Sequence, residues 1–307
     1  MVLRNTLFWG VEMGNIRRLV IYTDKISTKK KILIYSDLHL GFKKGNDFRE
    51  IAKIQELRPE NFDCILLPGD IIHHFGVFLD SEKLKSVLKT LKLLTGETPT
   101  YYILGNHDQY KRFHFEDWEA TNADRFCQEL YGLGNFLQLE DGVLYKDGEI
   151  ELKGLNISAS YSLLGHEREQ AFLEEYNQVV HEGNFSKQCF SIFMVHDPKS
   201  IYRLSKKNGH VLEANTDLVL SGHMHDGLVP RCFQSILKGR GLLSPDYTIL
   251  PRYAYGVREV GESLFYINGA MNAFIENEFL NRLYGFSCTE LTLEPSVKTK
   301  KLVYDYN

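Results

Sequence analysis

The sequence contains few cysteines, and none are spaced to form a metal-binding or redox pair. Five cysteines lie far apart along the chain, at Cys64, Cys127, Cys189, Cys232 and Cys288. Because there is no CxxC pair and the number is odd, the pattern excludes a zinc finger and disfavours a disulfide framework. We therefore expect free thiols in a reducing compartment, and a cytoplasmic protein.

The chain also lacks a long apolar run. No stretch reaches the roughly 18 consecutive apolar residues of a membrane-spanning helix, so no transmembrane segment is predicted. Near the N-terminus, Gly10 and Glu12 follow the apolar residues 7 to 9 and interrupt what would be the core of a secretory signal.

There is no excess of positive charge. The 36 Lys and Arg residues are outnumbered by 40 Asp and Glu residues, which gives a formal net charge of -4. Proteins that bind long stretches of nucleic acid rely on Lys and Arg to neutralise phosphates, so nucleic acid is a disfavoured partner. With 43% hydrophobic and 25% charged residues among 307, the composition is that of a globular protein with a sizeable core.

Short apolar runs alternate with helical patterns in the first part of the chain. Residues 32 to 35, 64 to 67 and 101 to 104 are apolar runs that end in polar residues. Apolar residues at helical spacing predict helices over residues 47 to 57 and 81 to 94. This alternation indicates an α/β fold, in which ligands bind at the carboxyl ends of the strands.

Residues 110 to 187 interrupt this rhythm with charged and aromatic segments and a predicted hairpin turn at Asp147-Gly148. We expect an insertion or lid there, within a single domain that spans residues 1 to 307. A long ordered loop is predicted for the Gly-, Pro- and Tyr-rich residues 228 to 262. Further strands are predicted at residues 190 to 195, 217 to 220, 263 to 267 and 288 to 293.

Metal-binding side chains follow five of the predicted strands, where each apolar run stops. The candidate ligands are Asp37, His39, Asp70, Asn106, His196, His223 and His225. Oxygen and imidazole donors without a thiolate suit Mn(II), Fe or Zn better than Ca or a structural zinc ion. Because so many ligands exceed what one ion takes while leaving a place for water, we expect two ions that share a carboxylate. Asp70, which follows Gly69, is the candidate for the shared ligand.

In their order, these blocks resemble the calcineurin-like metallophosphoesterases, whose pattern is D-x-H, G-D, G-N-H-[DE], H and G-H-x-H. All five blocks occur between residues 37 and 225. The resemblance implies a four-layer α/β/β/α sandwich of two mixed sheets with flanking helices. It also implies a first metal held by Asp37, His39, Asp70 and His225, and a second held by Asp70, Asn106, His196 and His223.

The same resemblance implies a dinuclear phosphoesterase in which a metal-activated hydroxide attacks the phosphorus of a small phosphorylated substrate. His107 would then stand beside the substrate, where it stabilises the phosphoryl oxygens or protonates the leaving group, and Asp108 would orient it. Residues 222 to 293 further resemble a bacterial subgroup in which GHxH is followed by a long loop and a Tyr-Gly element, here Tyr255-Gly256. That subgroup acts on phosphodiesters or pyrophosphates, including lipid-linked sugar nucleotides, often at membranes.

Several alternatives stay open at this point. We expect His73 to line the site without binding metal, whereas Arg252 and Tyr255 either contact substrate, contact a membrane surface, or only pack within their loop. A phosphomonoester substrate, a nuclease of the same superfamily and a non-catalytic scaffold on the same fold also remain. A scaffold is disfavoured because such proteins are expected to lose ligands, and none of the blocks is lost here.

Overall fold

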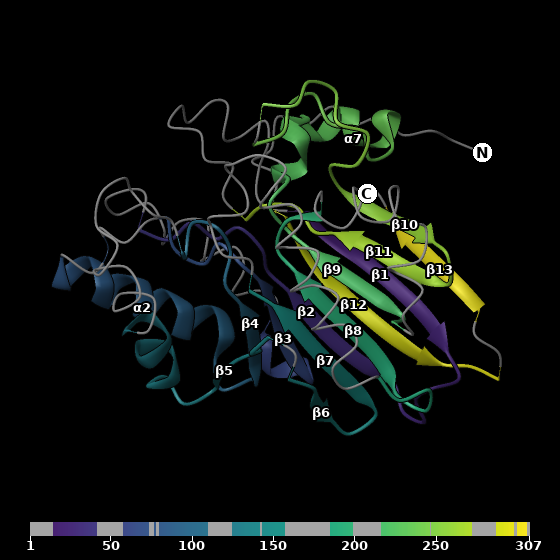
Figure 1. The fold of residues 1–307 in the computed structure, drawn as a ribbon, viewed down its shortest axis with the longest axis horizontal. Helices are drawn as coiled ribbons and strands as arrows, with labels where there is room; N and C mark the ends of the chain where they lie inside the picture. Colours follow the sequence, from purple (N-terminus) through teal and green to yellow (C-terminus); the bar gives the residue numbers. More distant parts are fainter. Residues whose placement is uncertain are drawn as a thin grey trace, which may run out of the picture.

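Two β-sheets packed against each other form the core of the protein (Figure 1). The computed structural model describes residues 15–41, 58–73, 77, 80–109, 125–141, 143–156, 185–198, 216–245, 247–271, 287–297 and 300–305. The first sheet has the strand order β13 (Lys300–Asp305), β1 (Asn15–Thr23), β12 (Ser287–Pro295), β2 (Lys30–Ile34), β3 (Cys64–Pro68), β4 (Thr100–Ile103) and β5 (Phe136–Gln138). The second has the order β10 (Gly256–Val260), β11 (Ser263–Ile267), β9 (Leu218–Ser221), β8 (Phe190–Val195), β7 (Ile150–Leu155) and β6 (Tyr145–Asp147).

Both sheets are mixed, but the strands that precede the candidate ligands run parallel. In the first sheet β2, β3 and β4 are parallel neighbours. In the second, β8 and β9 are parallel neighbours. The carboxyl ends of parallel neighbours lie at one edge of a sheet, so the residues after these strands are brought together.

Alternate residues of the central strands face two different cores. Ile32 and Ile34 of β2 pack between the two sheets, whereas Leu33 faces the opposite side of the first sheet. All three are fully buried, and burial of each such side chain contributes about 1.5–3 kcal/mol. This explains why the strands appear continuously apolar in the sequence, since neither face meets water.

Helix α2 (Ser81–Thr95) covers the outer face of the first sheet (Figure 1). Leu84, Val87 and Leu91, spaced three and four residues apart, point into that core. Asp80 caps the N-terminus of the helix, because its carboxylate accepts hydrogen bonds from the backbone amides of Glu82 and Lys83.

The structure confirms the α/β class with two mixed sheets, the helix predicted over residues 81 to 94 and the hairpin at Asp147-Gly148. Gly148 adopts a φ of 58°, which the tight turn between β6 and β7 requires. The prediction of one long loop over residues 228 to 262 was wrong. Short elements interrupt it, namely η4 (His225–Leu228), α7 (Arg231–Leu237) and β10, which pairs with β11.

Part of the predicted insertion belongs to the core. Within residues 110 to 187, β5 is part of the first sheet, and β6 and β7 are part of the second. The charge and aromatic content of this region concealed β5, whereas the turn between β6 and β7 was predicted. The helix predicted over residues 47 to 57 lies outside the described residues, as does any helical layer on the outer face of the second sheet. A single domain with a lid remains a prediction.

Candidate metal centre

The five segments that follow β2, β3, β4, β8 and β9 meet at one place. The backbone amide of Asp37 donates to the carbonyl of Gly69 at 3.2 Å, and that of His39 donates to the carbonyl of Asp70 at 3.1 Å. The segment after β9 joins them, because the amide of His223 donates to both carboxylate oxygens of Asp37 at 3.1 and 3.0 Å. The strand ends are thus bonded directly to one another.

One group of side chains gathers Asp37, His39 and Asp70, which are buried, and His225, which is partly buried, and their ligand atoms all lie within 4.8 Å of one another. The Nε2 atoms of His39 and His225 are 3.1 Å apart. Nε2 of His225 lies 3.3 Å from Oδ1 of Asp37, and Nε2 of His39 lies 3.7 Å from Oδ2 of Asp70. Two imidazole nitrogens and two carboxylates therefore point at a common centre.

A second group gathers Asp70, His196 and His223. Nε2 of His196 lies 3.1 Å from Oδ2 of Asp70. The side-chain oxygen of Asn106 lies 3.1 Å from Nε2 of His196 and 3.0 Å from Nδ1 of His223. Asn106 thus completes a second set of nitrogen and oxygen donors.

Asp70 belongs to both groups and is 1% exposed. Its Oδ1 accepts a hydrogen bond from the amide of His107 at 2.8 Å, while its buried Oδ2 accepts no hydrogen bond of good geometry from the residues that the structure describes. A buried carboxylate oxygen without a hydrogen bond is costly unless a cation satisfies it. Together with the mixture of imidazole, carboxylate and amide donors, this fits a pair of metal ions on either side of Asp70.

The backbone at this centre is held in an unfavourable conformation. Five candidate ligands have a positive φ, namely Asp37 (53°), His39 (43°), Asp70 (55°), His223 (67°) and His225 (47°). A residue other than glycine in this region costs about 1–3 kcal/mol, and such residues concentrate at functional sites. The surrounding structure must therefore over-determine these turns.

Two glycines allow the strand ends to approach this closely. Gly69 has a φ of 88°, and a Cβ there would lie 2.6 Å from Nδ1 of His196. A Cβ on Gly105 would collide with the carboxylate of Asp70. Any larger residue at either position would displace a candidate ligand.

A backbone carbonyl orients His196. Its Nδ1 lies 2.7 Å from the carbonyl oxygen of Pro68, a partner that can only accept, so Nδ1 carries the proton and Nε2 faces the centre. This arrangement, in which one ring nitrogen donates to a carbonyl and the other is aimed inward, is typical of histidines that bind metal.

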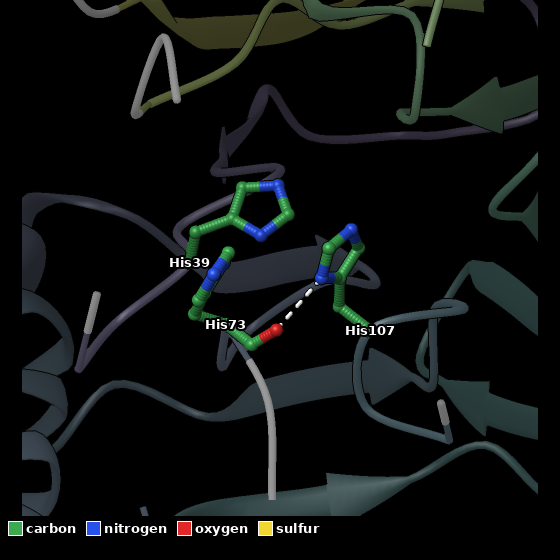
Figure 2. A group of neighbouring side chains, drawn as sticks. All are labelled: His39, His73 and His107. Atoms are coloured by element: carbon green, nitrogen blue, oxygen red, sulfur yellow. Dashed lines mark hydrogen bonds between the residues drawn. The ribbon is translucent and has the colours of Figure 1, made fainter. Parts of the chain in front are cut away.

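His107 lies at the edge of this centre with His39 and His73 (Figure 2). Figure 2 shows the three imidazoles gathered together, with Nδ1 of His107 2.7 Å from the carbonyl oxygen of His73. That contact places the proton on Nδ1 and turns Nε2 away from the backbone. The ring centroids of His39 and His107 are 4.6 Å apart, so His107 is next to a candidate ligand.

Asp108 holds the backbone together at this edge. Its carboxylate accepts hydrogen bonds from the amides of Ile71 (3.2 Å), Ile72 (2.9 Å) and Gly105 (2.9 Å). The carboxylate ties the segment after β3 to the segment after β4, and the carbonyl of His73 contacts the imidazole of His107. A role for Asp108 in orienting this imidazole stays a prediction.

The charges at the centre shift several pKa values. Burial would raise the pKa of Asp37, but His225 and His196 outweigh it and lower the pKa to about 2. Burial would likewise raise the pKa of Asp70, yet His196, His107 and His39 hold it well below its usual value. Both carboxylates are thus ionised. For Asp108, burial and the neighbouring Asp70 raise the pKa to about 7 despite three backbone hydrogen bonds.

The imidazole pKa values are shifted in two opposite directions. Burial lowers the pKa of His39 well below its usual value and also lowers that of His223. In His196, burial acts in the same direction, but Asp70 and Asp37 outweigh it and raise the pKa to about 10. At neutral pH, therefore, His39 is ready to act as a ligand, whereas His196 carries a proton in the absence of a cation.

The remaining predicted residues lie in the segment after α7. The side chain of Arg252 is exposed, and its carbonyl accepts a hydrogen bond from Arg258. Tyr255 is 2% exposed, and its hydroxyl donates to the carbonyl of Gln234 at 2.8 Å. Tyr255 therefore packs within this segment, and we do not include it among the proposed substrate contacts.

Sequence reasoning missed two residues beside the site. Asp226, which directly follows His225, forms a buried ion pair with Arg17, with 2.7 Å between Oδ1 of Asp226 and Nη2 of Arg17. The GHxH block marks the neighbourhood of Asp226, but no local signal links it to a residue 209 positions earlier.

Comparison with known proteins identifies relatives of the chain. Residues 30–227 match the family model described as calcineurin-like phosphoesterase. An uncharacterised metallophosphoesterase of Helicobacter pylori is 27% identical over 227 residues, which cover 72% of this chain and 53% of the relative. One from Campylobacter jejuni is 25% identical over 207 residues, covering 65% of this chain and 45% of the relative. The chain spans about half the length of these curated relatives.

Two solved structures resemble the chain more distantly. A phosphopantetheinyl hydrolase of Mycobacterium tuberculosis has 11% identity and a TM-score of 0.40, covering 78% of this chain and 89% of its own. A dimetal phosphatase of Danio rerio has 12% identity and a TM-score of 0.39, covering 78% and 87% respectively.

Metal binding should release a proton from His196. Its pKa is raised from 6.5 to about 10, so the imidazolium stabilises the metal-free protein fully below pH 6.5 and this stabilisation is lost as the pH rises through about 10. A metal ion that binds Nε2 must displace this proton, so the affinity for Mn²⁺ should rise with pH between 7 and 10. Calorimetric titration at pH 8 in buffers of different ionisation enthalpy measures the release. A binding heat that does not depend on the buffer would contradict the assignment.

Proposed function

Because the chain belongs to the calcineurin-like phosphoesterase family, we propose that it hydrolyses a phosphoric ester at a centre that holds two metal ions. The observation that carries this proposal is the position of Asp70, which is common to two adjacent groups of buried ligands. We propose Asp37, His39, Asp70 and His225 for one ion, and Asp70, Asn106, His196 and His223 for the other. Mn, Fe and Zn suit these donors.

When bound, such ions neutralise phosphoryl oxygens and lower the pKa of water to near neutrality. The residues of the chain would hold the ions and keep their ligands in position. The carboxylates of Asp37 and Asp70 provide the negative charge that holds two cations close together. The segments after β3 and β4, which the carboxylate of Asp108 ties together, keep these ligands at constant distances.

We assign His107 to the substrate. Its Nδ1–H is held by the carbonyl of His73, so His107 acts here as the imidazolium, whose second proton on Nε2 is donated to a phosphoryl oxygen or transferred to the leaving oxygen. His73 lines the same edge, with its ring 5.4 Å from that of His107 and stacked on it. Arg252, which is exposed, is proposed as a further contact for an anionic substrate.

Phosphodiesters and pyrophosphates are the proposed substrate class, with phosphomonoesters as the alternative. The pattern of GHxH followed by Tyr255-Gly256 supports this choice. A nuclease is disfavoured by the net charge of -4. A scaffold is disfavoured because each predicted ligand is retained and lies in the centre. Among the described residues, Cys64, Cys127, Cys189 and Cys288 form no disulfide, and we propose a reducing compartment, the cytoplasm, as the location.

The first test is hydrolysis of bis(p-nitrophenyl) phosphate beside p-nitrophenyl phosphate by chelator-treated protein supplied with Mn²⁺. We expect diester hydrolysis that requires the metal. Asp70→Asn should reduce activity to background and reduce the metal content by at least half, because one side chain serves both ions. Lys85→Ala, at an exposed position on α2, is the control and should resemble the wild type. Full metal content and activity in Asp70→Asn would refute the shared ligand.

His107→Ala should separate turnover from metal binding. Since His107 contacts substrate in this proposal rather than metal, kcat should fall by roughly 10²- to 10⁴-fold while the metal content stays unchanged. Steady-state kinetics with metal analysis of the same sample provides the comparison. An unchanged kcat would remove His107 from the reaction, and loss of one metal would make it a ligand.

We further propose a peripheral contact with anionic membranes through an apolar surface formed by Phe233, Ile236, Leu242, Tyr247, Ile249 and Leu250. All six side chains are exposed, with Tyr247 at 85% and Ile249 at 76%. Residues 231 to 252 contain four Lys and Arg residues and a single acidic residue, Asp246. Exposed apolar side chains with basic neighbours favour the interface of an anionic bilayer. No helix among the described residues is long and apolar enough to cross a membrane.

Sedimentation with vesicles tests this contact. The protein should sediment with phosphatidylglycerol vesicles and not with phosphatidylcholine vesicles. Replacing Ile236 and Ile249 by Ser should reduce the partition coefficient about tenfold or more, because two aliphatic side chains that would enter the bilayer are lost. Tyr131→Ser, at a position that is 75% exposed outside this surface, is the matched control. Equal sedimentation of both variants, or none for the wild type, would contradict the contact.

A further inference from the structure

A buried arginine from the first described strand reaches the loop that carries the candidate ligand His225. Arg17 lies on β1 and is 5% exposed. Its Nη2 lies 2.7 Å from Oδ1 of Asp226 and 2.9 Å from Oε1 of Gln234 on α7. The guanidinium carbon also lies 5.7 Å from the centre of the Tyr255 ring. The guanidinium group of Arg17 thus links β1, η4 and α7.

Asp226 is fixed from a second side as well. The hydroxyl of Ser287, the first residue of β12, donates to Oδ2 of Asp226 at 3.3 Å. The backbone of Gly269 passes so close that a Cβ there would collide with both carboxylate oxygens. Asp226 therefore has little freedom to move once Arg17 has bound it.

The backbone around Asp226 is in an unfavourable conformation. Asp226 has a φ of 54° and Gly227 a φ of 61°, and His225 before them has a φ of 47°. Successive left-handed residues are unfavourable for side chains with a Cβ, although Asp tolerates this region better than most. A charge-assisted hydrogen bond to the side chain in the middle of this turn stabilises it.

The loop is thus anchored at both ends. At its beginning, the amide of His223 donates to the carboxylate of Asp37. At its end, Arg17 holds Asp226. His225 lies between the two anchors, next to the second of them, with Nε2 3.3 Å from Asp37 and 3.1 Å from His39.

We propose that Arg17 is a positioning residue of the metal centre, which sets the imidazole of His225 through the Arg17–Asp226 ion pair. The inference rests on the proposed function, because it concerns the same site. It is not part of the matched family region, since Arg17 precedes residue 30. Arg17 touches neither metal nor substrate in this account.

The test measures binding of Mn²⁺ to the chelator-treated full chain. Arg17→Met should weaken one of the two sites by about 10- to 100-fold, the usual effect of losing a residue that orients a ligand, and leave the other within about twofold. The weakened site should be the one that His225→Gln also removes. Arg17→Lys, which keeps the ion pair with Asp226, should recover most of the affinity. Arg18→Met, at a neighbouring side chain that is 69% exposed, should bind like the wild type.

A purely structural role is distinguished by a second variant. Breaking one half of a buried ion pair destabilises a protein, whereas removing both charges relieves the unpaired charge. Arg17→Met with Asp226→Asn should therefore recover much of the Tm lost in Arg17→Met, while the affinity of the His225 site stays low. Recovery of Tm and affinity together, equal weakening of both sites, or wild-type affinity in folded Arg17→Met would each overturn the proposal.

A wild-type protein that takes up no Mn²⁺ would refute the proposed function and still allow this inference to be judged. In that case the Cε1–H resonance of His225, observed in protein labelled with ¹³C-histidine, should shift in Arg17→Met and not in Arg18→Met. An unchanged resonance would overturn the positioning role. If the protein binds two Mn²⁺ ions but hydrolyses no ester, the proposed enzymatic activity is refuted. The titration of the two sites still tests the role of Arg17 in that case.

Discussion

The centre depends on a single carboxylate, Asp70, which lies close to two sets of imidazoles that are candidate ligands. Nε2 of His196 and Nε2 of His39 both lie close to its Oδ2, at 3.1 and 3.7 Å. Because the surroundings keep Asp70 ionised and buried, the centre is organised around a negative charge that needs cations. The parallel strands, the close glycines and the left-handed turns all serve to bring partners to this one side chain.

The two-sheet architecture explains how residues from such distant parts of the chain meet. Asp37, Asp70 and Asn106 follow parallel strands of the first sheet, and His196 and His223 follow parallel strands of the second. Packing of the two sheets through the shared core brings the two sets of strand ends together. The backbone strain at five of the ligands, about 1–3 kcal/mol each, is offset by this packing and by hydrogen bonds such as those of Asp108.

The sequence predicted much of this arrangement. The ordered blocks from Asp37 to His225 contain the residues that the structure brings together. They could be recognised because each block follows a short apolar run that predicts a strand. Contacts between distant residues could not be predicted in this way. Nothing local pairs Arg17 with Asp226, and nothing local shows that Asp108 bonds to Ile71 and Ile72. The strand β5 was also missed, because its three residues give too little periodicity, and of β6 and β7 only the hairpin turn between them was predicted.

Anomalous X-ray diffraction from crystals soaked in Mn²⁺, recorded at the manganese absorption edge, tests the central claim most directly. The account predicts two peaks on either side of the Asp70 carboxylate, one near His39 and His225 and the other near His196 and His223. A single peak, or two peaks that do not share Asp70, would contradict it.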